Sequence, residues 1–188
     1  MSAWDFFNSN VVQNIIMVIT VAVTIWIYFL QRKAARRDAA RVIVIQIDSI
    51  SQKMELLIRA IENDASKFDA GKLWQIESVI ENNEWIKYRH LFVKKLHYNE
   101  IVALNNFYDD VVSVRFQQEE IRKIISETNK NFYIKYSEIS DKELEETKPQ
   151  EYIRVSTLYL QTIQMQYEKI RNSRDAIPYA RLKKIAKI

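Results

Sequence analysis

The chain has 188 residues, of which 48% are hydrophobic and 28% are charged, a balance that excludes global disorder. One glycine, two prolines and no cysteine exclude disulfides, thiolate metal sites and glycine-rich phosphate loops, and predict helices joined by few turns. The net charge of +4 comes from two short basic flanks, residues 32–41 and 171–188, around a mildly acidic remainder. This distribution does not resemble the basic surface of a nucleic-acid-binding domain, so nucleic acid is not an expected partner.

The segment from Val11 to Leu30 predicts a membrane-spanning helix. Its residues read VVQNIIMVITVAVTIWIYFL, and as a helix they would cover about 30 Å, the thickness of the hydrocarbon core of a bilayer. Trp4 precedes the segment, and Trp26 and Tyr28 lie near its other end, where aromatic rings meet the lipid–water interface. A buried core helix of this length would usually show a polar stripe. We therefore predict a transmembrane helix over residues 11–31.

Five basic residues that follow the apolar segment predict its orientation. Basic residues next to a membrane span remain on the cytoplasmic side, and these five also suit contact with anionic lipid head groups. A cleaved signal peptide is disfavoured, because its positive charge would precede the apolar run. We predict an extracytoplasmic N-terminus over residues 1–10 and a cytoplasmic C-terminal domain at the cytoplasmic (inner) membrane. The five residues are Arg32, Lys33, Arg36, Arg37 and Arg41.

One face of the apolar segment is polar. Gln13, Met17, Thr20 and Thr24 recur at spacings of four, three and four residues, which places them on the same side of a helix. Polar side chains in lipid favour contacts between helices, so Gln13, Thr20 and Thr24 form a possible oligomer face or line a small pore. The alternative is that the polarity has no role, because threonine can bond to the backbone of its own helix.

Residues 32–63 predict a basic juxtamembrane and heptad helix that continues from the anchor, because KAARRDAAR is rich in helix-forming residues. The β-branched window VIVIQI leaves a short strand as the competing interpretation. An apolar seam follows at alternating spacings of three and four, typical of a helix that packs against long helical partners, and it is a second possible oligomer face. The seam consists of Ala40, Ile43, Ile47, Ile50, Met54, Leu57 and Ile61. Its heptad phase differs from that of the Gln13 face.

Residues 64–188 predict a helical bundle with a basic C-terminal tail. We expect one helix over residues 72–108, kinked at Asn82–Asn83, a second over residues 110–136, and a third that has Pro149 in its first turn and ends within residues 172–178. The polar tract at residues 137–148 predicts a loop or a short capped turn. The first of these helices has two apolar faces, which is typical of a central helix. One face has Trp85, Tyr88, Phe92, Leu96, Ala103 and Phe107, and the other has Ile86, His90, Val93, His97 and Leu104.

The tail YARLKKIAKI predicts a short basic amphipathic helix that binds a lipid surface or a partner. Its candidate contact residues are Arg181, Lys183, Lys184 and Lys187.

No arrangement of residues predicts catalysis or metal binding. His90 and His97 are the only histidines, and seven helical residues would separate them by about 10 Å along the axis, too far to share one ion. The chain has no Glu-x-x-His, G-x-S-x-G or S-x-x-K motif. We therefore predict no enzyme activity, no cofactor and no small-molecule substrate.

The prediction as a whole is an all-α protein in which one N-terminal transmembrane helix continues into a cytoplasmic antiparallel helical bundle. Its expected function is that of a single-pass, membrane-anchored interaction module, non-enzymatic, such as a scaffold, a sensor or an exclusion-type protein. The expected partners are the membrane and either another protein or a second copy of the chain. The alternative is an oligomerising membrane effector that perturbs the bilayer, an idea that rests on the polar face at Gln13, Thr20 and Thr24.

Overall fold

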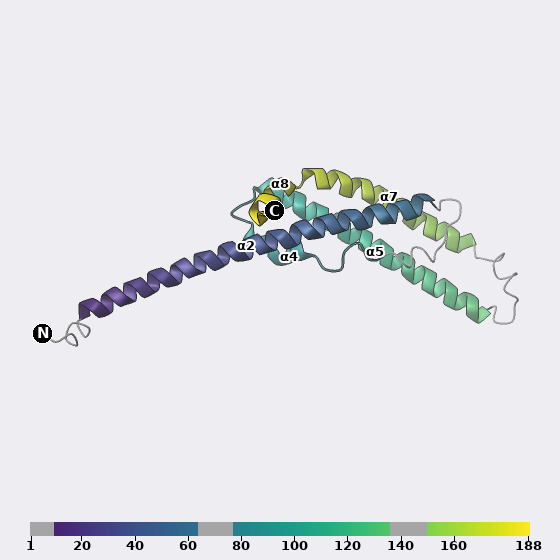
Figure 1. The fold of residues 1–188 in the computed structure, drawn as a ribbon. Helices are drawn as coiled ribbons and strands as arrows, with labels where there is room; N and C mark the ends of the chain where they lie inside the picture. The colour runs from purple at the N-terminus through teal and green to yellow at the C-terminus, as the bar shows by residue number, and fades with distance from the viewer. Residues whose placement is uncertain (1–9, 64–76, 136–149) are drawn as a thin grey trace.

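The structure is a computed structural model that describes residues 10–63, 77–135 and 150–188 (Figure 1). Within these ranges the chain is helical and contains no strand, so the predicted all-α class is confirmed and the strand interpretation of VIVIQI is wrong. The predicted extracytoplasmic residues 1–10 lie outside this description except for Asn10, and the predicted loop at 137–148 lies outside it entirely. The elements are α2 (Asn10–Asn63), α4 (Glu84–Tyr88), the 3-10 helix η1 (Arg89–Leu91), α5 (Tyr98–Lys135), α7 (Gln150–Ala176) and α8 (Tyr179–Ala186).

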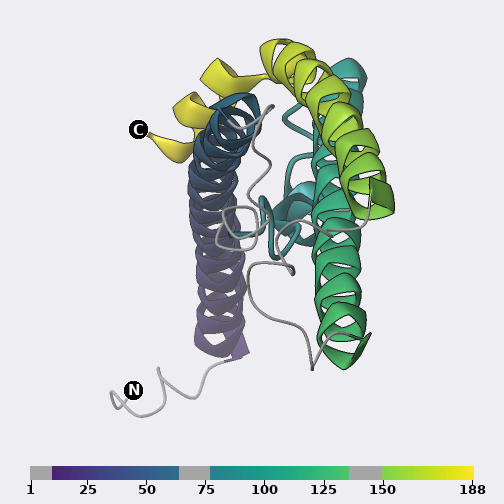
Figure 2. The same ribbon diagram turned by 90° about the vertical axis from the view of Figure 1, so that its right-hand side faces the viewer.

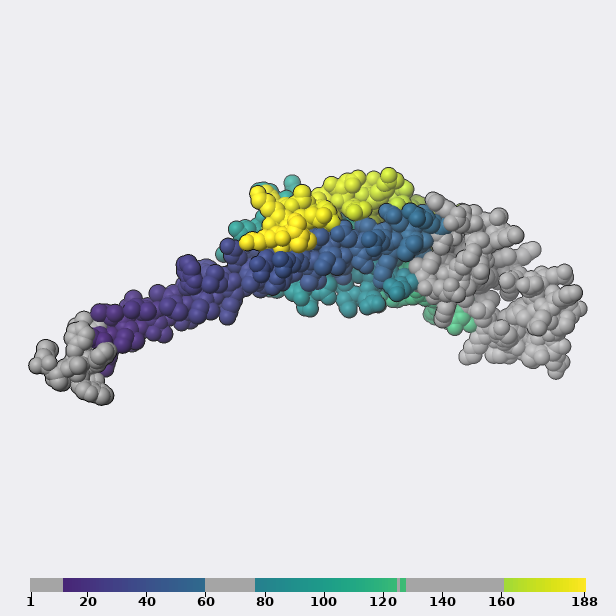
Figure 3. Space-filling view, viewed as in Figure 1, coloured from purple at the N-terminus to yellow at the C-terminus, as the bar shows by residue number. Residues whose placement is uncertain are grey.

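Helix α2 is a single helix of 54 residues, so the apolar segment and the heptad segment form one continuous element, as predicted. At about 1.5 Å per residue it is about 80 Å long. Its N-terminal half projects away from the other helices, and its C-terminal half packs among them (Figures 1 and 3). We call the packed part of the molecule the body.

The segment from residue 77 to residue 91, which we call the return segment, runs back along α2 towards the projecting half. Lys53 Nζ donates a hydrogen bond to the backbone oxygen of Ser78 at 3.2 Å, and Arg36 Nε donates to the oxygen of Leu91 at 3.1 Å. The later residues of this segment thus contact the earlier residues of α2, so the segment and the helix run antiparallel. The turn after Leu91 consequently lies at the end of the body that faces the projecting half of α2.

Helices α5 and α7 lie side by side and run antiparallel (Figure 2). Ser173, near the end of α7, donates a hydrogen bond from its hydroxyl to the Asp110 carboxylate at 3.2 Å, early in α5. Helix α7 begins directly after Pro149 and ends at Ala176, within the predicted range. Short α8 then packs along α2.

The predicted helix over residues 72–108 is wrong in the part that the structure describes. Residues 77–83 are not helical, and α4 contains only five residues. Asn83 is the N-cap of α4, where its side-chain oxygen accepts a hydrogen bond from the Ile86 N–H at 3.2 Å, so this asparagine begins a helix instead of kinking one.

A second break separates η1 from α5. Glu100 accepts a hydrogen bond from the backbone N–H of His97 at 2.7 Å, which is one half of a capping box at the start of α5. Helix α5 then continues to Lys135 without the predicted interruption near residue 109. Residues 98–135, which the sequence assigns to two helices, thus form the single helix α5.

The core combines the heptad seam of α2 with aromatic side chains of the return segment and α5. The seam residues from Ala40 to Leu57 are each 0–1% exposed, as expected for a packed seam, and the side chain of Ile61 lies outside the description. Trp85, Phe92 and Phe107 are also buried. Of the two apolar faces predicted for residues 72–108, the face with these aromatics points inward. The other does not, because Ile86 and Val93 are exposed and only Leu104 is buried.

Candidate functional site

The projecting half of α2 is an apolar surface without cover in the structure. Its large apolar side chains from Ile15 to Leu30 range in exposure from 46% at Ile27 to 68% at Val18. Continuous apolar surface of this extent is rare on proteins that lie in water and marks contact with a membrane or another protein. Helix α2 is long and apolar enough to cross a membrane.

The two threonines of the predicted polar face bond within their own helix. Thr20 Oγ1 donates to the backbone oxygen of Ile16, and Thr24 Oγ1 donates to that of Thr20, both at 2.8 Å. The structure thus shows the alternative that the sequence leaves open for these hydroxyls. Gln13 is exposed on the same face.

Four of the five basic residues after the apolar segment divide into two groups, and the fifth, Arg37, forms an ion pair with neighbouring Asp38 at 3.6 Å. Arg32 and Lys33 are exposed, as expected of residues that face lipid head groups. Arg36 instead bonds to the Leu91 oxygen, and Arg41 Nε donates to the backbone oxygen of Ala186 at 3.0 Å. The Arg41 bond places a cation at the C-terminal end of α8, where the helix dipole is negative. Arg36 and Arg41 therefore hold the return segment and α8 against α2, a role that the sequence does not reveal.

Helix α8 presents its apolar side to the body and its lysines to solvent. Leu182 and Ala186 are buried, and α8 packs on α2. Lys183, Lys184 and Lys187 are exposed. The apolar side of this amphipathic helix is thus already covered, which leaves the basic side for any contact with a surface.

Arg181, the fourth basic residue of the predicted tail, binds within the protein. Its guanidinium forms an ion pair with Glu100 at the start of α5. Burial alone would raise the pKa of Glu100, but the hydrogen bond from His97 and the pairing with Arg181 outweigh it and lower the pKa below the ordinary value of 4.5. Arg181 thus joins α8 to α5.

Tyr179 joins the start of α8 to α2. Its hydroxyl lies 2.6 Å from both carboxylate oxygens of Asp48. Desolvation, followed by the hydrogen bond and the negative charge of Asp48, raises the pKa of Tyr179 from 10.0 to about 12. Arg174 acts in the opposite direction but more weakly.

We expect this bond to stabilise the fold at neutral pH and to do so less above pH 10. Below the unfolded pKa of 10.0 the hydroxyl is protonated in both states; between 10.0 and about 12 only the unfolded chain loses the proton, so stability falls. Tyr179→Phe should therefore lower the free energy of unfolding at pH 9, and the difference from the parent should shrink at pH 11. Urea unfolding at both pH values measures this, with exposed Tyr98→Phe as the control. A difference that is constant with pH would contradict the prediction.

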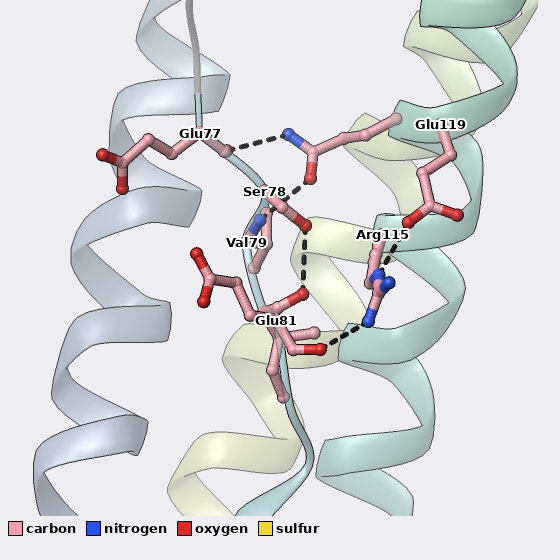
Figure 4. A network of polar contacts seen from close by, with 8 residues as sticks. Glu77, Ser78, Val79, Glu81, Arg115 and Glu119 are labelled. Atoms are coloured by element: carbon pink, nitrogen blue, oxygen red, sulfur yellow. Dashed lines mark hydrogen bonds and ion pairs between the residues drawn. The ribbon is translucent and has the colours of Figure 1, made fainter.

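The non-helical segment at residues 77–83 is held by side chains of α5. Gln118, a buried polar residue, accepts a hydrogen bond from the Val79 N–H at 3.0 Å and donates to the Glu77 oxygen at 3.5 Å. Arg115 donates to the Glu81 oxygen at 2.6 Å (Figure 4). A non-helical backbone inside a helical body needs such partners, because neither a helix nor a neighbouring strand supplies its hydrogen bonds. Gln118 supplies one donor and one acceptor, as a paired strand residue would.

Gln118→Ala is expected to lower the free energy of unfolding by about 1–3 kcal/mol, because it leaves the buried backbone N–H of Val79 and the partly buried oxygen of Glu77 without their partner. Urea denaturation followed by circular dichroism measures the loss. The matched control is Lys123→Ala, an exposed position on the same helix, which should stay within about 0.5 kcal/mol of the parent. Equal stability of both variants would show that the Gln118 bonds do not hold the segment.

The turn between α4 and α5 forms a basic surface at the end of the body that faces the projecting half of α2. The bond from Arg36 to Leu91 sets its position. Its exposed residues are Arg89, His90, Val93, Lys94, Lys95, His97 and Tyr98, and residues 85–99 contain no carboxylate side chain. Sequence reasoning missed this surface, because it assigned these residues to the middle of a helix.

The described residues contain no group of three or more His, Cys, Asp or Glu side chains that could hold a metal ion. His90 and His97 are exposed in the basic turn. An open polar hollow lies between α5 and α7, lined by Asn106, Asp109, Asp110, Lys169, Asn172 and Ser173. It pairs carboxylates with an amine, amides and a hydroxyl, which suits ion pairing and hydrogen bonding.

Comparison of the chain with protein-family models, with curated proteins and with solved structures finds no match in any of the three. Its function must therefore be inferred from its own residues and geometry.

Proposed function

We propose that this protein is a single-pass, membrane-anchored interaction module with its helical body on the cytoplasmic side of the inner membrane, and that it acts without catalysis. The observation that supports this most directly is the continuity of α2. One helix has an exposed apolar half long enough to span a bilayer and a second half whose seam is the core of the body. The anchor therefore fixes where the body sits and which partners it can meet.

The charge at the anchor-facing end of the body supports the same arrangement. Arg32 and Lys33 follow the apolar segment, and the basic turn at residues 89–98 and the lysines of α8 lie at the same end of the body. Each basic residue near an anionic membrane surface contributes about 1 kcal/mol of attraction. In this proposal the basic end rests on lipid head groups, and the rest of the body extends into the cytoplasm as a docking surface for a scaffold, sensor or exclusion-type role.

The bilayer-perturbing alternative has weaker support. A pore needs polar groups that face its lumen, whereas the Thr20 and Thr24 hydroxyls bond to the backbone of α2 itself. Expression of the chain in cells that contain a membrane-potential dye separates the two functions. We expect no depolarisation, and rapid depolarisation would favour the effector.

Labelling of single cysteines tests the anchor and its orientation, because the chain has no cysteine of its own. We expect Asp5→Cys to react with a membrane-impermeant maleimide in intact spheroplasts. Met165→Cys, on α7 and 67% exposed, should react only after lysis. Both should react in detergent, which controls for accessibility. Labelling of Met165→Cys in intact spheroplasts would overturn the proposed orientation.

A further inference from the structure

One side of α2 remains uncovered along the body. The return segment bonds to Gln46 and Lys53, and α8 bonds to Arg41 and Asp48, so these contacts occupy the flanks of the helix on either side of the buried seam. At about 100° per residue, Ile45 points about 200° away from both Ile43 and Ile47 of the seam. The uncovered side therefore lies opposite the core.

Apolar residues occur on this uncovered side. Val42, Ile45 and Leu56 are exposed by 37%, 65% and 60%. Ser49 and Gln52 lie between them at helical spacing. Val42 and Ile45 are three residues apart, and Leu56 lies eleven residues, about three turns, after Ile45, so all three are on one side of the helix.

The same stripe continues through the apolar half of α2. Steps of three or four residues lead from Leu56 back to Gln13, and the average step is close to the 3.6 residues of a straight helix. We call the residues reached by these steps the outer face: Gln13, Met17, Thr20, Thr24, Tyr28, Gln31, Ala35, Asp38, Val42, Ile45, Ser49, Gln52 and Leu56. All of them are exposed except Ser49, which is half-buried. The polar face predicted from the sequence is its N-terminal part.

The outer face has few charges. Between Gln31 and Leu56 its only charged member is Asp38, which forms ion pairs with Arg37 and Arg41, both at 3.6 Å. A surface in permanent contact with water would be expected to hold more charged residues, since 28% of the chain is charged. Small, apolar and neutral polar side chains instead resemble the centre of a protein interface.

We propose that the outer face of α2 is the contact surface for a second copy of this chain, in a parallel dimer. This inference rests on the proposed function, because insertion in one direction makes the two copies parallel. The face extends from the membrane into the cytoplasm, so a partner that covers all of it must itself be a helix that crosses the membrane boundary at the same depth. A second copy meets this requirement, and a two-fold axis brings Gln13 to Gln13 and Ile45 to Ile45.

The geometry gives each half of the dimer a distinct source of stability. In the membrane the amide of Gln13 can both donate to and accept from its copy, while Thr20 and Thr24 are small enough for close approach. Outside the membrane Val42, Ile45 and Leu56 would lose contact with water. The heptad seam is not needed, because the chain's own body already covers it.

Disulfide crosslinking in native membranes tests the dimer. The variants Met17→Cys, Ile45→Cys and Leu56→Cys place one thiol each on the outer face. Val18→Cys is the matched control in the membrane, since Val18 is 68% exposed and lies about 100° around the helix from Met17. Met165→Cys on α7 is the control on the body. With a mild oxidant we expect a product of twice the chain mass for the three outer-face variants and several-fold less for both controls.

Each other outcome overturns the proposal at a recognisable step. Equal crosslinking of outer-face and control variants would indicate random collision. A product of another mass would identify a different protein as the occupant. Lack of any product from protein that resists alkaline extraction would overturn the dimer and leave the anchor intact. Protein that is absent from membranes would overturn the proposed function itself.

A second variant tests whether the two halves form one interface. Ile45→Glu changes an exposed position, so the body should still fold, but it places a charge on the outer face in the cytoplasm. In the Met17→Cys background it should reduce crosslinking within the membrane several-fold. Met165→Glu, an equally exposed change, should leave crosslinking unchanged. Equal crosslinking of the two would show that the cytoplasmic stripe takes no part in the dimer.

Discussion

Arginine at both Ile19 and Val23 is expected to remove the protein from the membrane fraction. The two positions lie near the middle of the apolar segment and are exposed on α2, so the charges could not be buried within the protein. Arginine at the centre of a spanning helix costs about 3 kcal/mol, and two therefore cost about 6 kcal/mol. The measurement is the fraction of protein that sediments with membranes and resists alkaline extraction.

A matched pair of substitutions on the body controls for charge itself. Val112 and Phe116 are also exposed and also four residues apart, on α5. Their replacement by arginine should leave the protein in the membrane. If the Ile19→Arg, Val23→Arg double variant resisted extraction as well as the parent does, residues 11–31 would not be the anchor.

Trp85→Ala is expected to lower the free energy of unfolding by about 3–5 kcal/mol, the usual cost of deleting a large buried aromatic side chain. Trp85 is 1% exposed, packs against Phe92 with ring centroids 6.0 Å apart, and donates a 2.7 Å hydrogen bond to the Asn105 side chain. The substitution removes the buried apolar surface of Trp85, its packing against Phe92 and its hydrogen bond to Asn105, and it leaves a cavity between α4 and α5. Urea unfolding of the full chain in detergent, followed by circular dichroism, measures the change.

The neighbouring residue provides the control. Ile86 lies on the same short helix but is 58% exposed, so Ile86→Ala should change stability by no more than about 0.5 kcal/mol. A similar loss in both variants would show that the burial of Trp85 is not what stabilises this part of the body.

Helix α2 could be predicted from the sequence almost completely, because its signals are local and periodic. A mainly apolar segment of twenty residues without Asp, Glu, Lys or Arg and a heptad seam from Ala40 to Leu57 are visible within a single stretch of chain. The same holds for α8, whose amphipathic pattern spans one short tail. In each case the spacing of side chains along one helix determines which of them are buried.

The return segment could not be predicted in the same way, because the contacts that hold it are distant in the sequence. Gln118 binds Val79, 39 residues earlier, and Trp85 binds Asn105, 20 residues later. The helix-forming residues predict a long helix, whereas tertiary hydrogen bonds hold residues 77–83 in a non-helical conformation. Two local signals could have revealed the breaks: Asn83 as an N-cap and Glu100 three residues after His97.

The candidate site shows the same division between local and distant information. The basic composition of residues 32–41 predicts proximity to lipid, but Arg36 and Arg41 bond to carbonyl groups 55 and 145 residues away. No pattern within the basic run distinguishes these two from Arg32 and Lys33. Only the fold shows which arginines hold the body to α2.

In the proposed membrane-anchored arrangement, the unbroken course of α2 connects the anchor rigidly to the body. Helices respond to a change in bilayer thickness by tilting. Because the body is fixed to the same rod, any tilt of the anchor becomes a tilt of the body. About 50 Å of helix follows the apolar segment, so a 10° change in tilt would move the far end by roughly 9 Å, mainly parallel to the membrane surface. A change in bilayer thickness would thereby shift the far end of the body sideways over the membrane.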